Sequence, residues 1–291
     1  MTLLRSKISV FTAAGVLFAG LSFAMSDRER DGLLGPVQTV ITEYGKLKEG
    51  SSEKIEKAAY DRAGNMVASE MAYTKIGQGN ATVSLRTTYE RDRSGAVTSS
   101  RAIAEDGALQ SKTSYKYDGR GNLTERVISG EKGDLIFKEL SKYDGSNRKI
   151  ETSYHLPNNM PASLQQYLYD ERGNVSFITS FKDCNSGERC RRLDYREVNT
   201  YDGKGNLIKM TLYKGDGSIE EVRVFHYTGS NILIEKDVFG PDTSLREKEI
   251  YVYKFDEFGN WIERITTTLT EMCRQSDTCK EKRTFTYFKN E

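Results

Sequence analysis

The stretch Tyr117-Asp118-Gly119-Arg120-Gly121-Asn122-Leu123 decides the fold, because its pattern occurs eight times in the chain. Each copy has an aromatic residue (Arg91 in one copy), an acid (Thr228 in one copy), two free positions and then Gly or Asn. The usual distance to the next copy is 26 residues, as from Tyr117 to Tyr143. Such a period is typical of a repeat architecture and says little about chemistry. The copies begin at Tyr60, Arg91, Tyr117, Tyr143, Tyr169, Tyr201, Tyr227 and Phe255.

The fifth position of each copy predicts a tight turn. It is Gly except at Asn147 and Asn231, and these two residue types enter the left-handed backbone region most readily. The second position is Asp except at Thr228, and an oxygen there can accept hydrogen bonds from amides two residues on. We therefore expect a type I turn closed by a left-handed bulge residue, with the aromatic residue paired across strands to an apolar one.

A second set of turn residues lies between the copies, as at Glu105-Asp106-Gly107 and Lys214-Gly215-Asp216-Gly217. Each unit is then strand, turn, strand, turn, and the span from Pro36 to Lys289 holds about 18 antiparallel strands. The predicted fold class is all-β, an antiparallel β-hairpin repeat array in meander order. Because strand twist accumulates, we expect a twisted or spiralling sheet.

The composition tests the alternative of an outer-membrane barrel. Hydrophobic residues make up 37% of the chain and charged residues 29%, and there are 17 Tyr but one Trp. A lipid-facing barrel needs one apolar face on every strand, whereas residues 137–143 place Lys138 and Glu139 on opposite faces. We therefore expect no membrane span in the mature chain. The net charge of +1, with signs interleaved, also predicts no nucleic-acid partner.

The N-terminus predicts export. Arg5 and Lys7 precede an apolar run from Ile8 to Ala24, and small residues at Ser22 and Ala24 suit a signal peptidase. An uncleaved anchor is the alternative. We expect a periplasmic or secreted bacterial protein. The predicted segments are a signal peptide over 1–24, an N-terminal extension over 25–35 and a single β-repeat domain over 36–291.

The four cysteines form two C-x5-C pairs at breaks between predicted strands. In an oxidising compartment the economical interpretation is two local disulfides, Cys184 to Cys190 and Cys273 to Cys279. The alternatives are one zinc ion on four thiolates, which usually requires a shorter spacing, and redox chemistry, which usually requires C-x-x-C.

Catalytic patterns are absent from the sequence. His155 and His226 lie far apart in predicted strands, and no phosphate loop, HExxH or nucleophile elbow occurs. Each turn offers one carboxylate, well short of the roughly six to eight oxygens that calcium takes. We predict a non-enzyme without cofactor or metal.

The units Tyr117–Leu123 and Tyr201–Leu207 resemble the YD repeats of bacterial RHS and wall-associated proteins and of teneurin ectodomains. The resemblance covers about residues 55 to 289. It implies an extracytoplasmic array of β-hairpins that spirals, in large members around a toxin, and that is often linked to carbohydrate binding. With eight units and no separate toxin segment, this chain departs from the large members.

Two functions remain open from the sequence. The first is a non-enzymatic binding or scaffold protein of the cell envelope, which holds a glycan or partner protein on a tyrosine-lined face. The second is a secreted or periplasmic carbohydrate-active enzyme, which would need paired carboxylates about 5 to 10 Å apart. No such pair stands out, so we favour the first. The predicted contact residues are Tyr117, Tyr169, Tyr201 and Tyr253.

Overall fold

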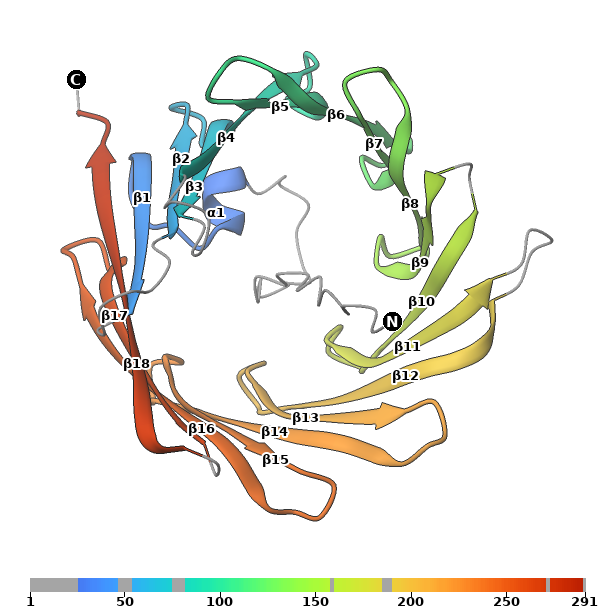
Figure 1. Ribbon diagram of the computed structural model, residues 1–291, viewed down its shortest axis with the longest axis vertical. Helices are drawn as coiled ribbons and strands as arrows, with labels where there is room; N and C mark the ends of the chain where they lie inside the picture. The colour runs from blue at the N-terminus through green and yellow to red at the C-terminus, as the bar shows by residue number, and fades with distance from the viewer. Residues whose placement is uncertain are drawn as a thin grey trace.

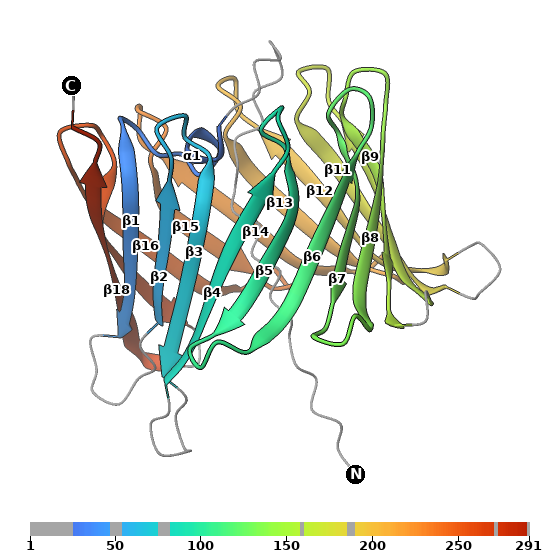
Figure 2. The same cartoon turned by 90° about the horizontal axis from the view of Figure 1, so that it is seen from above.

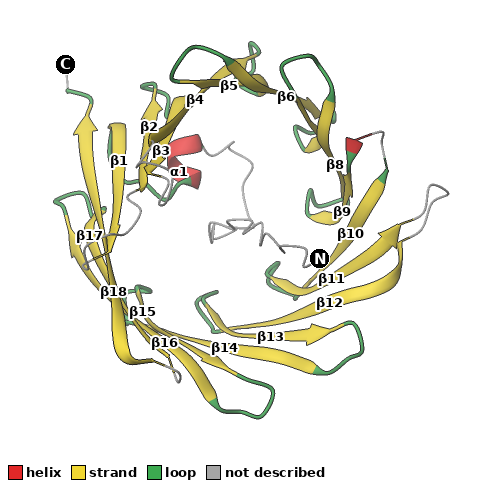
Figure 3. Cartoon of the chain, viewed as in Figure 1, coloured by secondary structure: helices red, strands yellow, loops and turns green. Residues whose placement is uncertain are grey.

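A computed structural model describes residues 26–46, 54–74, 82–157, 160–184, 190–270 and 273–289. Strands run around the whole ring, with one short helix, α1 (Asp27–Arg30), on its inner side (Figure 1; Figure 3). The strands are β1 (Val37–Lys46), β2 (Lys54–Tyr60), β3 (Met66–Thr74), β4 (Thr82–Arg91), β5 (Val97–Ala104), β6 (Leu109–Tyr117), β7 (Leu123–Ser129), β8 (Leu135–Tyr143), β9 (Lys149–His155), β10 (Pro161–Tyr169), β11 (Val175–Cys184), β12 (Cys190–Tyr201), β13 (Leu207–Lys214), β14 (Ile219–Tyr227), β15 (Leu233–Phe239), β16 (Leu245–Phe255), β17 (Trp261–Thr270) and β18 (Cys273–Tyr287).

The eight repeat turns have the backbone that the sequence predicted. Their fifth residue has a positive φ in every copy, from 61° at Asn147 upward. The Asp118 amide donates to the Asn122 carbonyl at 3.0 Å, and Asp118 Oδ1 accepts from the amides two and four residues on, at 2.9 Å each. Thr228 uses its hydroxyl in the same way. The prediction of a capped turn with a left-handed residue is confirmed.

Strand β1 closes the sheet into a barrel. It pairs antiparallel with both β18 and β2, so that Thr42 lies opposite Arg283 on one side and Glu56 on the other. Every other strand pairs with its neighbours in the chain, and the 18-stranded sheet forms one ring (Figure 1; Figure 2). The antiparallel meander is confirmed, but the open spiral is wrong. Accumulated twist brings the last strand back to the first, and closure leaves no unpaired edge.

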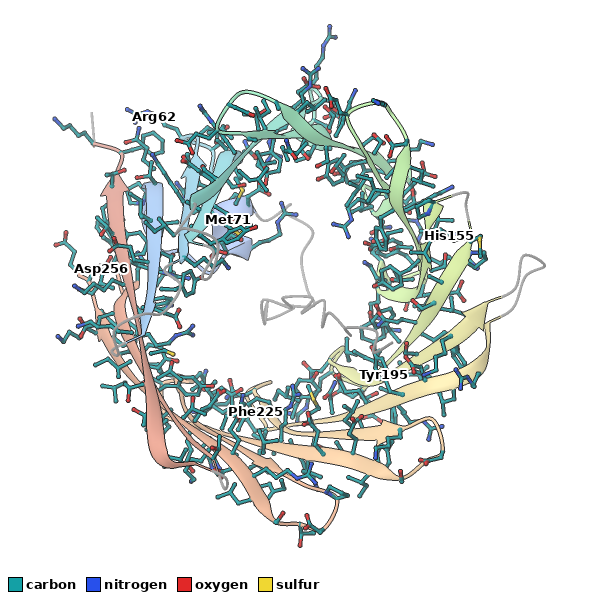
Figure 4. All side chains as sticks on the ribbon, viewed as in Figure 1. Arg62, Met71, His155, Tyr195, Phe225 and Asp256 are labelled. Atoms are coloured by element: carbon teal, nitrogen blue, oxygen red, sulfur yellow. The ribbon has the colours of Figure 1, made fainter. Side chains whose placement is uncertain are left out.

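The pairing register fixes which side chains point into the ring. Met71, Tyr195 and Phe225 lie on its inner side (Figure 4). Directly opposed residues of an antiparallel pair share a face, so each of these positions assigns a face to its neighbours around the ring. Met71 lies opposite Glu56, which lies opposite Thr42, so all three face inward. We call this face the inner wall, the opposite face the outer wall, and the enclosed space the lumen.

The barrel has almost no packed core. Of the described hydrophobic residues, only five are buried: Leu33, Val37, Val40, Tyr60 and Val238. The first four form one cluster beside α1, where the chain between α1 and β1 packs on the inner wall. Elsewhere side chains stand in a layer on each face of a single sheet (Figure 4). A barrel of about 16 to 18 strands is wide enough for such a layer to leave an aqueous channel.

The cysteine prediction is wrong for one pair. Cys273 and Cys279 both belong to β18 and lie opposite Thr270 and Thr266 of β17. These partners are four residues apart, so the Cα atoms of the cysteines are separated by roughly 13 Å, far beyond the reach of a disulfide. Cys279 is a free thiol, and the described residues contain no disulfide. Cys184 and Cys190 are directly opposed across β11 and β12, but their side chains and that of Cys273 lie outside the described residues.

Candidate functional site

The candidate site is the inner wall, and its most regular feature is a row of tyrosines. The Tyr143 hydroxyl donates to the Leu123 carbonyl at 2.8 Å, which ties its hairpin to the preceding one. Because these hydroxyls are bound to backbone carbonyls, hairpin-to-hairpin bonding explains why Tyr recurs in the repeat. We call this row the tyrosine ladder. It comprises Tyr117, Tyr143, Tyr169, Tyr201 and Tyr227, with bonds of 2.6 to 3.1 Å.

The four predicted contact tyrosines are not gathered into one site. Tyr117, Tyr169 and Tyr201 are members of the ladder, on β6, β10 and β12, whereas Tyr253 stacks between Tyr251 and Phe255 on β16. Their positions are spread around the ring (Figure 1). A direct role in ligand contact stays a prediction.

Arg91 takes the ladder position in the one unit that lacks an aromatic residue. Its guanidinium donates to the Met66 carbonyl at 3.1 Å, as the tyrosine hydroxyls do in other units. It also forms an ion pair with Asp27 of α1 and donates to the Gly95 carbonyl at 2.7 Å. The exception in the repeat therefore marks the place where α1 binds, a signal that the sequence carried but that we did not interpret.

A small pocket of about 110 Å³ lies between α1 and the inner wall. Asp27, Asp31, Arg30, Tyr89 and Arg91 contribute to its lining. Burial raises the pKa of Asp31, although a hydrogen bond from the Tyr60 hydroxyl opposes this shift. The polar groups around the pocket are largely paired, as Asp27 is with Arg30 and Arg91. We therefore interpret the pocket as space left where α1 is attached to the wall, and not as a ligand site.

Most charged groups of the inner wall are paired across strands. Arg126 donates twice to Glu139, at 3.1 and 2.8 Å, and its guanidinium lies 5.9 Å from the Phe137 ring centroid. Arg264 and Glu281 form a second close pair, with three hydrogen bonds of 2.7 to 3.2 Å. Such pairs leave the wall polar with little net charge.

Neutral polar groups form a network beside the Arg126–Glu139 pair, since Tyr154 lies directly opposite Glu139 across β8 and β9. The Gln165 side chain accepts from the hydroxyls of Tyr154 and Tyr167 at 3.2 and 2.9 Å, and its amide donates to the Tyr195 hydroxyl at 2.7 Å. The network joins β9, β10 and β12 and presents aromatic edges toward the lumen.

Trp261, the single tryptophan of the chain, lies between two arginines. The guanidinium carbon of Arg283 is 3.7 Å from the ring centroid, and that of Arg264 is 5.1 Å away. Arg283 faces inward, because it pairs with Thr42 and, through it, with Glu56 and Met71. The arrangement is a cation–π stack on the inner wall.

The outer wall carries ion pairs near the repeat turns. Lys116, which precedes the ladder residue Tyr117, lies 2.7 Å from Glu125, and Lys254 and Lys280 lie 2.9 and 2.7 Å from Glu263. Other outward positions are apolar, notably on β10, β11 and β16. Their exposed fractions are 63% for Leu168, 37% for Phe177 and 58% for Val252.

One outer-wall cluster has metal-binding residue types. Ligand atoms of His226, Glu235 and Asp237 lie within 4.8 Å of one another. The Lys248 ammonium, however, lies 2.6 Å from Glu235 and 3.0 Å from Asp237, where a cation would bind. An internal ion-pair network therefore accounts for the cluster without a metal.

Comparison with known proteins gives a fold likeness only. No family model and no curated protein matches the chain. A porin-like protein from Bacteroides uniformis aligns with 87% of this chain and 99% of its own length, at 10% identity and a TM-score of 0.50. A porin-like protein from Bacteroides vulgatus aligns at 11% identity with a TM-score of 0.29, over 87% and 98% of the two chains. The Photorhabdus luminescens Tc holotoxin pore aligns at 12% identity and a TM-score of 0.18, over 73% of this chain and 15% of its own.

These findings correct two predictions. The resemblance to YD-repeat proteins implied a spiralling array, whereas the chain closes on itself in one turn and its fold is similar to that of a porin-like protein. An envelope binding or scaffold protein that uses an open tyrosine-lined face is likewise overturned, because closure turns that face into the inside of a barrel. The short repeat motif determines the hairpin, and two unlike architectures can use the same hairpin.

No helix among the described residues has the length and apolar character to cross a bilayer.

Proposed function

We propose that this chain forms a porin-like pore of the bacterial outer membrane, through which small polar solutes pass along the lumen. The observation that carries the proposal is a closed ring of 18 strands whose inner wall is lined with polar and aromatic groups in place of a packed core. The charged sequence after the apolar N-terminal run suits an exported protein.

The inner wall supports passage of polar solutes. Ion pairs such as Arg126 with Glu139 hold charged groups against the wall, and the Gln165 network does the same for neutral ones. A solute then meets fixed dipoles and aromatic edges that can replace part of its hydration. Because both signs of charge are present, bulk charge selectivity should be weak.

In a membrane pore the outer wall must be apolar where it faces lipid, and only part of it is. The pairs near the repeat turns would lie at the membrane interface, and Leu168, Phe177 and Val252 would face lipid. Lys57, Arg86 and Lys112, however, occupy outward positions deeper in β2, β4 and β6. A lysine or arginine at the bilayer midplane costs about 2 to 4 kcal/mol. These three outward charges favour a second candidate, in which the outer wall of the barrel is surrounded by water and not by lipid.

Vesicle flotation and planar-bilayer conductance of the mature chain separate these arrangements. A pore should float with lipid and give discrete conductance steps. In a variant with the four cysteines replaced by serine, a charged thiol reagent should reduce conductance at Met71→Cys on the inner wall. It should leave conductance unchanged at Val252→Cys on the outer wall. A chain that neither floats nor conducts would refute the pore.

A further inference from the structure

Arg283 differs from the other inner-wall arginines in having no hydrogen-bond or ion-pair partner among the described residues. Its Nε is shielded from solvent and has no partner. The contact that holds it is the Trp261 ring, 3.7 Å from the guanidinium carbon. A guanidinium has five N–H donors, and stacking on an indole uses none of them.

The three carboxylates that interact electrostatically with Arg283 are Glu281, Glu56 and Asp31, and all three are bound to other groups. Asp31 accepts from the Tyr60 hydroxyl. Both oxygens of Glu281 accept from Arg264. Glu56 lies 2.5 Å from the Lys54 ammonium and accepts from the Tyr44 hydroxyl at 2.6 Å. Arg283 is therefore a preoriented cation whose two Nη groups have no acceptor among the described residues and can donate to an acceptor from solution.

Arg126 provides the comparison within the same wall. It too lies over an aromatic ring, Phe137, but two of its N–H groups donate to Glu139. The two sites share an arginine and an aromatic ring and differ in the carboxylate. Where the carboxylate is missing, an acceptor from solution can take its place.

We propose that Arg283 and Trp261 form a binding site for oxyanions on the inner wall, so that the solutes include molecules with a carboxylate or phosphate group. The Arg283 guanidinium would donate two parallel hydrogen bonds to the oxyanion, while the Trp261 indole stacks against the face of the guanidinium and fixes its orientation. The inference deepens the proposed function by naming a solute class. Binding itself does not require a membrane.

Trp261 reports on this site directly, because it is the only tryptophan in the chain. Titration of the folded mature chain with inorganic phosphate, and separately with acetate, should change its fluorescence in a saturable manner. Arg283→Gln should weaken binding by at least about tenfold, since it removes a charge-assisted pair of hydrogen bonds. Arg86→Gln, at an outward and exposed position on β4, is the control and should bind as the parent chain does.

A second variant keeps the test decisive if Arg283→Gln fails to fold. Glu281→Gln removes the carboxylate that binds Arg264, so a second guanidinium beside Trp261 becomes available and oxyanion binding should tighten severalfold. No saturable change with either anion, or equal losses in Arg86→Gln and Arg283→Gln, would overturn the site. Saturable binding without bilayer conductance would refute the pore and leave the site intact.

Discussion

The regular wall from β5 to β15 and the seam where the barrel closes are held by different bonds. In the regular wall each hairpin repeats the same turn and most repeat the same tyrosine bond to the hairpin before it. At the seam, formed by β16–β18 and β1–β4, the ends of the chain meet and the repeat has no further copy to bind. Residues 26–36 lie across this seam and form hydrogen bonds to strands on both sides of it.

The seam contacts of residues 26–36 come from single residues on either side. Asp27 pairs with Arg91 on the side of β4 and also accepts from the Met66 amide at 2.7 Å. On the other side, Asn260 donates to the Leu34 carbonyl at 2.8 Å and accepts from the Leu34 amide at 2.7 Å. The regular wall is held by many equivalent bonds, whereas at the seam the pairing of β1 with β18 is supplemented by contacts that occur once in the chain.

The largest effect is expected at Arg91→Ala. The change removes the guanidinium's hydrogen bonds to Met66, Gly95 and Asp27 and leaves Asp27 with only the exposed Arg30 as its cation, so the free energy of unfolding should fall by about 3 kcal/mol. Urea unfolding followed by far-UV circular dichroism measures this. Arg86→Ala, an outward and exposed position on the same strand, is the control and should have little effect. Equal losses would show that α1 does not brace the seam.

Asn260→Ala sharpens the comparison at the other side of the seam. Asn260 is 4% exposed and makes two backbone bonds to Leu34, so the loss should be about 2 kcal/mol. Asn206 has the same place in a turn of the regular wall but bonds only to Asp202 and Asn231. Asn206→Ala should therefore cost less than half as much in the same unfolding assay. A reversed order would contradict the distinction between seam and wall.

Tyr143→Phe tests the regular wall by removing a single ladder bond. The ring and its packing remain, so the loss should be about 1 kcal/mol, the usual net value of one hydrogen bond. Tyr213→Phe on the outer wall is the control, since its hydroxyl has no partner among the described residues, and its unfolding midpoint should stay unchanged. If the two variants behave alike, the ladder adds nothing to stability.

The sequence predicted the wall much better than the seam, and the reason is locality. The turn at Asp118 needs only a side-chain acceptor and a residue with positive φ three positions later, both visible in one short stretch. Closure depends on how twist adds over 18 strands, which no single stretch determines. Nothing in the sequence separates Asn260 from the other turn asparagines.

The site was partly visible for the same reason. The predicted contact tyrosines stood out because most of them belong to the repeat. Their recurrence is explained by hydrogen bonds between neighbouring hairpins, which stabilise the fold. Arg91 and Trp261 are the informative residues, because Arg91 is the one copy without an aromatic residue at the first position and Trp261 is the single tryptophan of the chain. The cysteine error came from reading polar residues 274–278 as a loop, whereas Asp277 pairs with Thr268 and the strand continues.

The smallest predicted effect is a difference in pH dependence between Asp118 in the wall and Asp31 beside the seam. The Asn122 side chain and backbone amides lower the pKa of Asp118, so the stability it contributes is present above about pH 4 and is lost as pH falls through the lowered pKa. Burial raises the pKa of Asp31, so its ionised form destabilises the fold above that raised value, and acidification relieves this.

Two asparagine variants separate these opposite signs. Asp118→Asn should lower the unfolding midpoint at pH 7 and match the parent chain only once the pH has fallen below the lowered pKa of Asp118, where both side chains are neutral. Asp31→Asn should raise the midpoint at pH 7, because it removes a partly desolvated charge while an amide oxygen can still accept from Tyr60, and it too should converge with the parent at low pH. If both variants shift the midpoint in the same direction at pH 7, the carboxyl groups of wall and seam do not differ in the way their surroundings predict.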